Sequence, residues 1–346
     1  MSDPGLRPPL RLLRLAPFRY GWPVKHIAAL RGTALLQRGA DDLVTVAAGT
    51  TGGDPDAPCS LDTRFQIASV TKQFTAAAVL LLADRGVLSV QDPVSRWLDG
   101  CPPAWDPITV HHLLCHTAGL AHWPGLPELD VATPVEADEK LRIFAAAPLL
   151  RPPGERFAYS SPGYVVLAHI LERATGLGYG ALLAREIFEP LEMDATFNGS
   201  PGDRPGLARG HHDGAAVPSF ALDTLGLGTR SIWSTVGDLA RWDRALAHGE
   251  LLSESAREAM FTVHVPVEDD DGVVRTEGYG YGWYVGSAAD GHRIFYHPGD
   301  NPGYRTINAW CPDDDVRLAV LSNEGTTDVG PILHGLIAIA FPGNVA

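Results

Sequence analysis

A serine and a lysine, Ser69 and Lys72, stand three residues apart where a buried helix is expected to start. Positions i and i+3 of a helix share one face, so the Lys72 amine can lie beside the Ser69 hydroxyl and remove its proton. A serine activated in this way attacks carbonyl carbon atoms. A structural role is the alternative, because serine often caps helices and a helical lysine can extend its ammonium group into solvent.

Three further segments carry polar side chains next to predicted elements. Tyr159 stands on a loop before a helix that Pro162 can start, where its phenol group could enter a cleft. His297 closes a predicted strand, and His116 ends a predicted helix. Each has a structural alternative: a core tyrosine, a strand-end histidine, and a histidine that interacts with a helix dipole.

Taken together, in this order, the four segments resemble the serine β-lactamase and penicillin-binding-protein superfamily, and more closely its class C, D-aminopeptidase, DD-peptidase and esterase branch. The resemblance covers most of the chain. The similar stretches are the Ser-x-x-Lys motif with its flanks, a His-Thr-Ser-Gly-Leu-like segment, the Tyr-x-Asn position, and the Lys-Thr-Gly or His-x-Gly position: residues 64–74, 116–120, 159–161 and 297–299. The segment that contains His116 is interpreted as structural.

The resemblance assigns roles that acyl transfer requires: a nucleophile, a base, a proton donor for the leaving group, and donors for the developing oxyanion. Ser69 attacks the carbonyl, and Lys72 serves as base if burial lowers its pKa. Tyr159 relays protons to the leaving group. The backbone N–H groups of Ser69 and of Asp300, which follows Gly299, form the oxyanion hole.

His297 replaces the usual cation of its motif with a group that titrates near neutral pH, so a pH-dependent rate is expected. Two other departures weaken the case for an efficient β-lactamase. Ser161 stands where the family usually has an asparagine, whose amide helps β-lactamases hold the acyl side chain. Pro298 removes an N–H donor from the strand that would bind an extended peptide.

Two charged residues that follow His297 leave open which substrate group the site binds. Asp300 is expected to be a surface acid turned to water, and turned inward it would favour a substrate amine. Arg305 could instead receive a substrate carboxylate. With Ser161 and Gly299, these residues complete the predicted substrate-binding set.

The elements that must position these residues follow from the hydrophobic periodicity. Strands are predicted at both chain ends, over residues 24–30, 33–37, 43–48, 283–286, 293–297, 304–310 and 316–322. Helices are predicted between them and at the C-terminus, over residues 110–115, 135–147, 162–175, 179–187, 235–248 and 328–341, besides the helix that follows Ser69.

Strands at both ends around a helical middle predict an α+β fold, in which one antiparallel sheet is built from both chain ends and flanked by helices. Residues 1–20 are interpreted as an N-terminal extension, and residues 21–346 as a single β-lactamase-like catalytic domain. Its α/β part comprises residues 21–80 and 262–346, and its helical lobe residues 81–261. The site is expected in the cleft between them.

Composition excludes several classes of function. The 346-residue chain is 45% hydrophobic, and its net charge of -14 repels nucleic acids and anionic lipids. No membrane-spanning stretch or signal peptide is recognised, which predicts a cytoplasmic protein without a membrane partner. Its four cysteines have irregular spacing, and its paired histidines lack metal spacing, so neither a metal nor a cofactor is predicted. The acidic run at 268–272 is interpreted as an exposed turn.

These observations predict a cofactor-free serine hydrolase that forms an acyl-enzyme on Ser69 and cleaves a small ester, amide or peptide bond. Because no second carboxylate stands ready for deacylation, an acyltransferase, or a penicillin-binding-protein-type thioesterase that releases or cyclises a peptide in a biosynthetic pathway, is the chief alternative. A β-lactamase and a non-catalytic binding protein are the others, and the intact Ser69, Lys72 and Tyr159 argue against the last. The expected partner is a small-molecule or peptide substrate, and no sequence signal indicates an oligomeric state.

Overall fold

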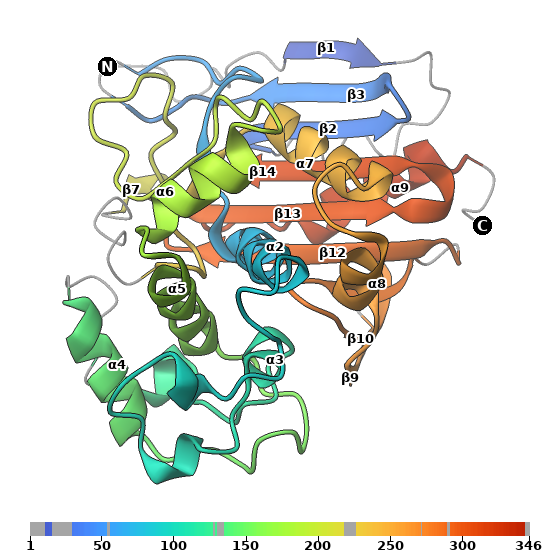
Figure 1. Ribbon diagram of the computed structural model, residues 1–346. Helices are drawn as coiled ribbons and strands as arrows, with labels where there is room; N and C mark the ends of the chain where they lie inside the picture. The colour runs from blue at the N-terminus through green and yellow to red at the C-terminus, as the bar shows by residue number, and fades with distance from the viewer. Residues whose placement is uncertain are drawn as a thin grey trace.

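A nine-stranded antiparallel sheet forms the centre of the computed structural model (Figure 1). The structure describes residues 11–15, 30–53, 56–126, 129, 135–217, 226–270, 272–288 and 291–342. Across the sheet, the strands follow the order β1-β3-β2-β14-β13-β12-β11-β10-β9. Their bounds are β1 Arg11–Leu15, β2 Gly32–Arg38, β3 Asp41–Ala48, β9 Val265–Asp270, β10 Val274–Tyr279, β11 Tyr284–Ala288, β12 Arg293–Asn301, β13 Tyr304–Cys311 and β14 Val316–Ser322.

The two ends of the chain build this sheet together. β14, near the C-terminus, pairs with β2, near the N-terminus, so that Leu318 lies opposite Leu36 and Val320 opposite Ala34. Every residue of β14 is buried, as expected for a central strand that is covered on both faces. The predicted α+β fold, with a sheet formed from both chain ends, is confirmed.

Helices cover both faces of the sheet. In Figure 1, α2 Thr71–Asp84, α7 Val236–His248 and α8 Glu254–Phe261 lie in front of it. α9 Gly330–Ala340 packs its apolar side chains into a second core cluster, which contains Leu36, whereas the neighbouring Leu35 belongs to the first. Since successive strand residues point to opposite faces, the two clusters lie on the two sides of the sheet.

The helical part lies below the sheet in Figure 1 and is joined to it through α2. Nearly every residue of α2 is buried, and the helix contacts both α5 and α8. The remaining helices and short strands are α3 Val110–Leu114, α4 Ala137–Ala146, α5 Ser161–Thr175, α6 Tyr179–Leu183, β4 Phe65–Gln66, β5 Phe197–Asn198, β6 His211–His212, β7 Ala215–Ala216 and β8 Ile232–Ser234. β4, β8 and β5 form a second small sheet beside the start of α2.

Several elements occur where the sequence predicts none. β1 belongs to residues 1–20, interpreted as an extension, yet it pairs with β3 at one edge of the large sheet. β9 forms the other edge and pairs with β10, and the acidic run expected as a turn extends β9 to Asp270. Edge strands carry many polar residues, which hides them from a search for apolar runs. Most of the strand predicted over residues 24–30 lies outside the described residues.

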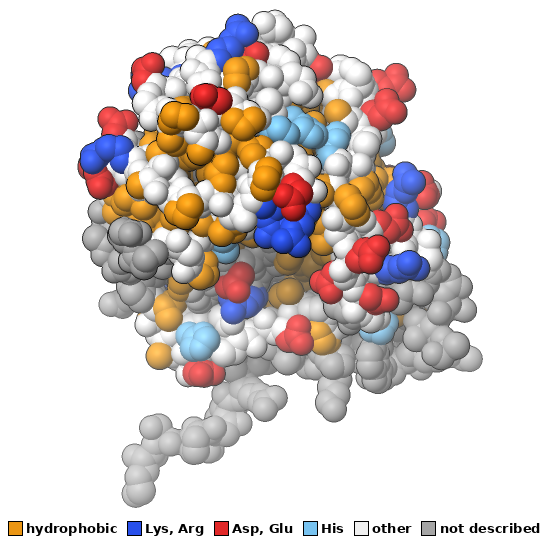
Figure 2. Space-filling view, turned by 90° about the horizontal axis from the view of Figure 1, so that it is seen from below, with side chains coloured by type: hydrophobic (Ala, Val, Ile, Leu, Met, Phe, Trp, Pro, Cys, Tyr) orange, Lys and Arg blue, Asp and Glu red, His pale blue; other side chains and the backbone are white. Residues whose placement is uncertain are grey.

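Surface features add two observations. Within the described ranges, no helix is both long and apolar enough to cross a membrane. On the face seen in Figure 2, acidic and basic side chains are interspersed among apolar ones and do not gather by sign.

Candidate active site

Ser69 lies on a 3-10 turn, η1 Ala68–Val70, directly before α2. The sequence places Ser69 as the cap of this helix, whereas the helix itself begins at Thr71. Ala68 is fully buried and has a φ of 49°, in the left-handed region that residues other than glycine seldom occupy. Strain of this kind is held by surrounding packing and is common at reactive sites. The turn leaves Ser69 half-buried between two buried neighbours, so its side chain remains accessible.

Lys72 is completely buried on the first turn of α2. Its Nζ lies 3.0 Å from Oγ of Ser69, 2.6 Å from Oγ1 of Thr229 and 3.3 Å from Oγ of Ser161. Burial, and secondarily the charge of Arg230, hold the pKa of Lys72 well below its usual value. Because a neutral amine keeps a lone pair, Lys72 can accept the proton of Ser69.

Tyr159 completes the arrangement around the Ser69 oxygen. Its phenol group donates a hydrogen bond of 3.0 Å to Oγ of Ser69. Burial raises the pKa of Tyr159 to about 12, so the phenol keeps its proton at neutral pH. Ser69, Lys72 and Tyr159 therefore lie together, and one oxygen contacts both an amine and a phenol.

His116 holds the loop that carries Tyr159. Its backbone has a φ of 57°, and its ring centroid lies 4.4 Å from that of Tyr159. The N–H of Ser160 donates to Nδ1 of His116 at 3.2 Å, and the N–H of Ala158 donates to its carbonyl oxygen at 2.8 Å. These contacts agree with the structural role that the resemblance implies for His116.

Gly299 allows β12 to approach the turn that carries Ser69. A Cβ atom at position 299 would lie 2.1 Å from Oγ1 of Thr306 and 2.6 Å from the carbonyl oxygen of Ile67. The Thr306 hydroxyl donates to that same carbonyl at 2.9 Å, which ties β13 to the turn as well. Only glycine leaves room for this approach, which brings the backbone of residues 299 and 300 next to Ser69.

His297 lies beside the site, but its protonation differs from the prediction made from its motif. The side chain is buried; Nδ1 donates to the carbonyl of Pro298 at 2.7 Å, and Nε2 accepts from the Tyr279 hydroxyl at 3.1 Å. Burial, reinforced by the charge of Lys72, lowers the pKa of His297 to about 3. The expectation that it titrates near neutral pH is therefore wrong, because tertiary packing keeps the imidazole neutral.

A cavity of about 470 Å³ opens onto the Ser69 oxygen, between β12 and the loop that carries Tyr159. This volume suits a small ligand. The cavity thus occupies the cleft expected between the sheet and the helical part. Its lining residues are Ser69, His122, Trp123, Tyr159, Ser161, Arg230, Tyr284, His297, Pro298, Gly299, Asp300, Arg305, Thr306 and Val329.

Asp300 and Arg305 form an ion pair at the mouth of this cavity. The Asp300 side chain is 70% exposed, in agreement with the expected water-facing acid. Arg305 already neutralises that carboxylate, so the interpretation of Arg305 as a free receptor for a substrate carboxylate is not supported. Ser161 directs its hydroxyl towards Lys72, which places it at the base of the site.

Comparison with known proteins assigns the chain to a family. A family model described as Beta-lactamase matches residues 24–340, most of the chain. The chain belongs to the β-lactamase family. It is a serine hydrolase of this family, and the predicted superfamily is confirmed.

Relatives within the β-lactamase family include penicillin-binding proteins and an esterase. Penicillin-binding protein 4* of Bacillus subtilis is 31% identical over 314 residues, which are 85% of this chain and 68% of that protein. Esterase EstB of Burkholderia gladioli is 35% identical over 212 residues, 56% of this chain and 53% of the esterase. The solved penicillin-binding protein from Bacillus halodurans has a TM-score of 0.77 and 27% identity, with 91% of this chain and 98% of that chain covered.

Two residues of the site, Thr229 and Arg230, were not predicted from the sequence. Thr229 supplies the shortest hydrogen bond of Lys72, and Arg230 lines the cavity, although both lie more than 150 positions after Lys72. Gly226, Thr229 and Arg230 belong to a turn before the buried strand β8. An arginine next to the apolar residues of β8 was the available signal, because a charged residue at the end of a buried strand needs a partner or a function.

Proposed function

We propose that Ser69 attacks the carbonyl carbon of a small ester, amide or peptide substrate and forms an acyl-enzyme. The observation that carries this proposal is the shared oxygen: Nζ of Lys72 and the hydroxyl of Tyr159 both lie 3.0 Å from Oγ of Ser69. One neighbour can remove the serine proton while the other supplies a proton nearby.

Acylation then proceeds with balanced proton movements. The neutral amine of Lys72 takes the Ser69 proton as Oγ bonds to the carbonyl carbon. Tyr159 gives its proton to the leaving oxygen or nitrogen as the scissile bond breaks, and Lys72 returns a proton to the phenolate. In the second half-reaction water replaces the leaving group, and the same residues act in the reverse direction.

The oxyanion that develops on the substrate needs backbone donors. We assign this role to the N–H groups of Ser69 and Asp300, which the resemblance implies. The close approach of β12 at Gly299 supports the assignment, because it brings this part of the strand next to the Ser69 turn.

Hydrolysis is favoured over transfer to another acceptor by the named activities of the relatives, which are an esterase, a D-alanyl-D-alanine carboxypeptidase and a D-amino acid amidase. An ester is the proposed first substrate class, since EstB is 35% identical in the matched region. Efficient turnover of β-lactams is not proposed, because Oγ of Ser161 accepts a hydrogen bond from Lys72 and the residue offers no amide to an acyl side chain. A cytoplasmic location remains a prediction.

A substrate panel tests this function. Hydrolysis of p-nitrophenyl esters, D-amino acid amides, a D-alanyl-D-alanine peptide and nitrocefin is measured with and without an added amine acceptor, for the wild type and for Ser69→Ala and Lys72→Ala. We expect the esters to be hydrolysed fastest, water to be the dominant acceptor, and both variants to lose the activity. Full ester turnover by Ser69→Ala would refute the proposal, and a rate that depends on the amine would favour an acyltransferase.

A further inference from the structure

Arg230 carries a buried positive charge that forms no salt bridge with a described residue. The residue is only 8% exposed, and Nε and Nη2 of its guanidinium group are buried without a hydrogen bond. These two nitrogens form one edge of the guanidinium, the edge that binds both oxygens of a carboxylate. A buried charge with unsatisfied donors is unfavourable, so an arginine in this state is suited to a partner that arrives with a ligand.

Local packing holds the guanidinium group at the cavity. The backbone N–H of Arg230 donates to the carbonyl of Gly226 at 2.9 Å, and Nδ2 of Asn301 donates to the carbonyl of Arg230 at 3.4 Å. Its guanidinium carbon lies 5.2 Å from the centroid of the Trp123 ring. Arg230 and Trp123 both line the cavity that opens onto Ser69. The side chain is thus fixed against an aromatic wall within the volume that a substrate would occupy.

Arg230 also supplies the unbalanced charge of this cavity. Asp300 pairs directly with Arg305 and acts on Arg230 only through a weaker electrostatic interaction, so the single carboxylate of the lining faces two guanidinium groups. Burial lowers the pKa of His297 to about 3 and that of His122 to about 4, so both rings are neutral at pH 7. Burial lowers the pKa of Arg230 to about 10, which still leaves it protonated. The cavity therefore has a positive excess, although the chain as a whole has a net charge of -14.

We propose that Arg230 binds an anionic group of the substrate, foremost a carboxylate, and makes the enzyme selective for anionic esters or amides over neutral ones of the same shape. This inference rests on the acyl-enzyme function proposed above and names the substrate class of that site. The anionic group can belong to the acyl part or to the leaving group. A role in folding alone, through the contact with Trp123, is the competing explanation.

Two matched pairs of esters show whether the anionic group that Arg230 binds belongs to the acyl part or to the leaving group. The acyl pair is p-nitrophenyl adipate with a free carboxylate and the same ester with that carboxylate methylated. The leaving-group pair is the butyrate ester of hydroxynitrobenzoic acid and that of its methyl ester. Each pair gives a ratio of kcat/KM values, anionic over neutral, in which the neutral ester controls for folding and for the catalytic groups.

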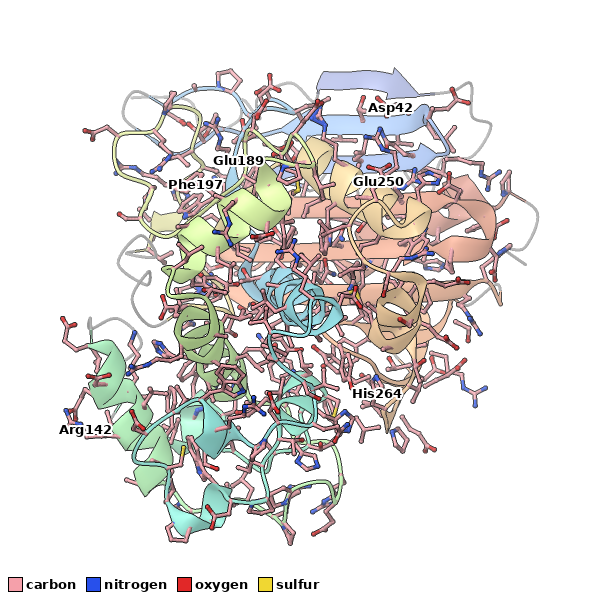
Figure 3. All side chains as sticks on the ribbon, viewed as in Figure 1. Asp42, Arg142, Glu189, Phe197, Glu250 and His264 are labelled. Carbon is pink, nitrogen blue, oxygen red and sulfur yellow. The ribbon has the colours of Figure 1, made fainter. Side chains whose placement is uncertain are left out.

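Three variants report on the charge. Arg230→Gln removes it, Arg230→Lys keeps it without the two-nitrogen edge, and Arg142→Gln removes an arginine elsewhere. Figure 3 shows Arg142 on α4, at the outer edge of the helical part, where its side chain is 72% exposed and pairs with Glu139. Arg142→Gln changes the net charge of the protein by the same amount as Arg230→Gln, which makes it the matched control.

We expect one of the two ratios to exceed one in the wild type and to fall about 10- to 100-fold in Arg230→Gln, the usual value of a charge-assisted hydrogen bond. Arg230→Lys should keep part of the ratio, and Arg142→Gln all of it. The pair that responds identifies which half of the substrate carries the anion. Ratios that are the same in the wild type and Arg230→Gln, with the neutral ester still hydrolysed, would overturn this inference and leave the serine-hydrolase function intact.

A boronic acid provides a readout that does not need turnover, because boron bonds reversibly to an activated serine. Inhibition by carboxyphenylboronic acid and by phenylboronic acid is compared in the wild type and Arg230→Gln. We expect the carboxylate to improve inhibition of the wild type only. An equal gain in both proteins would contradict the role of Arg230, whereas no inhibition by either compound would count against the acyl-enzyme function itself.

Discussion

Nζ of Lys72 lies closer to Oγ1 of Thr229, at 2.6 Å, than to Oγ of Ser69, at 3.0 Å. A neutral amine has two protons and one lone pair. If one proton is donated to Thr229, the lone pair can be directed at the hydroxyl of Ser69. Thr229 is therefore a positioning residue, which orients the base and does not itself touch the substrate.

Replacement of Thr229 by valine, which has nearly the same shape, tests this role. Loss of the acceptor should lower kcat/KM by about 10-fold through poorer orientation of Lys72. It should also shift the acidic limb of the pH–rate profile to lower pH, because fewer acceptors stabilise the ammonium form of Lys72. Steady-state kinetics from pH 5 to 9 measure both effects. A fall in rate with an unmoved acidic limb would indicate a structural role only.

The pH dependence of the rate should not come from His297. Burial lowers the pKa of His297 to about 3, so the ring is neutral throughout the range in which the enzyme is assayed. His297→Gln keeps a polar group that can reach the hydroxyl of Tyr279. We expect its pH–rate profile to keep the wild-type midpoint, even if the maximal rate falls. A midpoint displaced by about one unit would restore His297 as the titrating group.

The stability of the fold should depend on His297 in acid. Its pKa is depressed from an ordinary value of 6.5 to about 3, so between these pH values the unfolded chain binds a proton that the native protein does not. Stability is therefore lost as the pH falls through this window. His297→Gln should reduce the slope of unfolding free energy against pH by at most about 1.4 kcal/mol per unit. Urea unfolding at several pH values measures the slope, and an unchanged slope would contradict the assignment.

The close approach of β12 to the Ser69 turn makes Gly299 intolerant of any side chain. Gly299→Ala should displace the strand and reduce kcat/KM by two orders of magnitude or more, with a loss of stability of about 1–3 kcal/mol. Gly178→Ala is the matched control, because nothing lies within 4 Å of a Cβ at that position. Kinetics and thermal unfolding are measured together. An active Gly299→Ala protein would mean that the strand does not constrain the site.

The sequence predicted those parts of the site that depend on local pattern. Ser69 and Lys72 lie three residues apart, and the helix that follows them is apolar, so their proximity follows from helical geometry. Tyr159 was found because it precedes a helix within a motif that resembles the family. The sheet built from both chain ends followed from apolar strands such as β14, whose residues are all buried.

The features that the sequence did not predict depend on tertiary packing or on polar strands. Thr229 and Arg230 belong to no local motif. Thr229 reaches Lys72, and Arg230 reaches the cavity, because β8 pairs with β4 next to the Ser69 turn. The titration of His297 was mispredicted because its burial is produced by neighbours such as Tyr279, which lies on another strand. The edge strand β9 and its neighbour β10 were missed because their polar residues resemble a surface turn.

The most direct test of the account is the identity of the acylated residue. A slowly hydrolysed p-nitrophenyl ester is mixed with the wild type and with Ser69→Ala, the reactions are quenched in acid during turnover, and the intact proteins and their peptides are weighed by mass spectrometry. We predict one acyl group on the wild-type peptide that contains Ser69 and none on Ser69→Ala. An acyl group on any other residue, or turnover by the wild type through a path that never modifies Ser69, would contradict it.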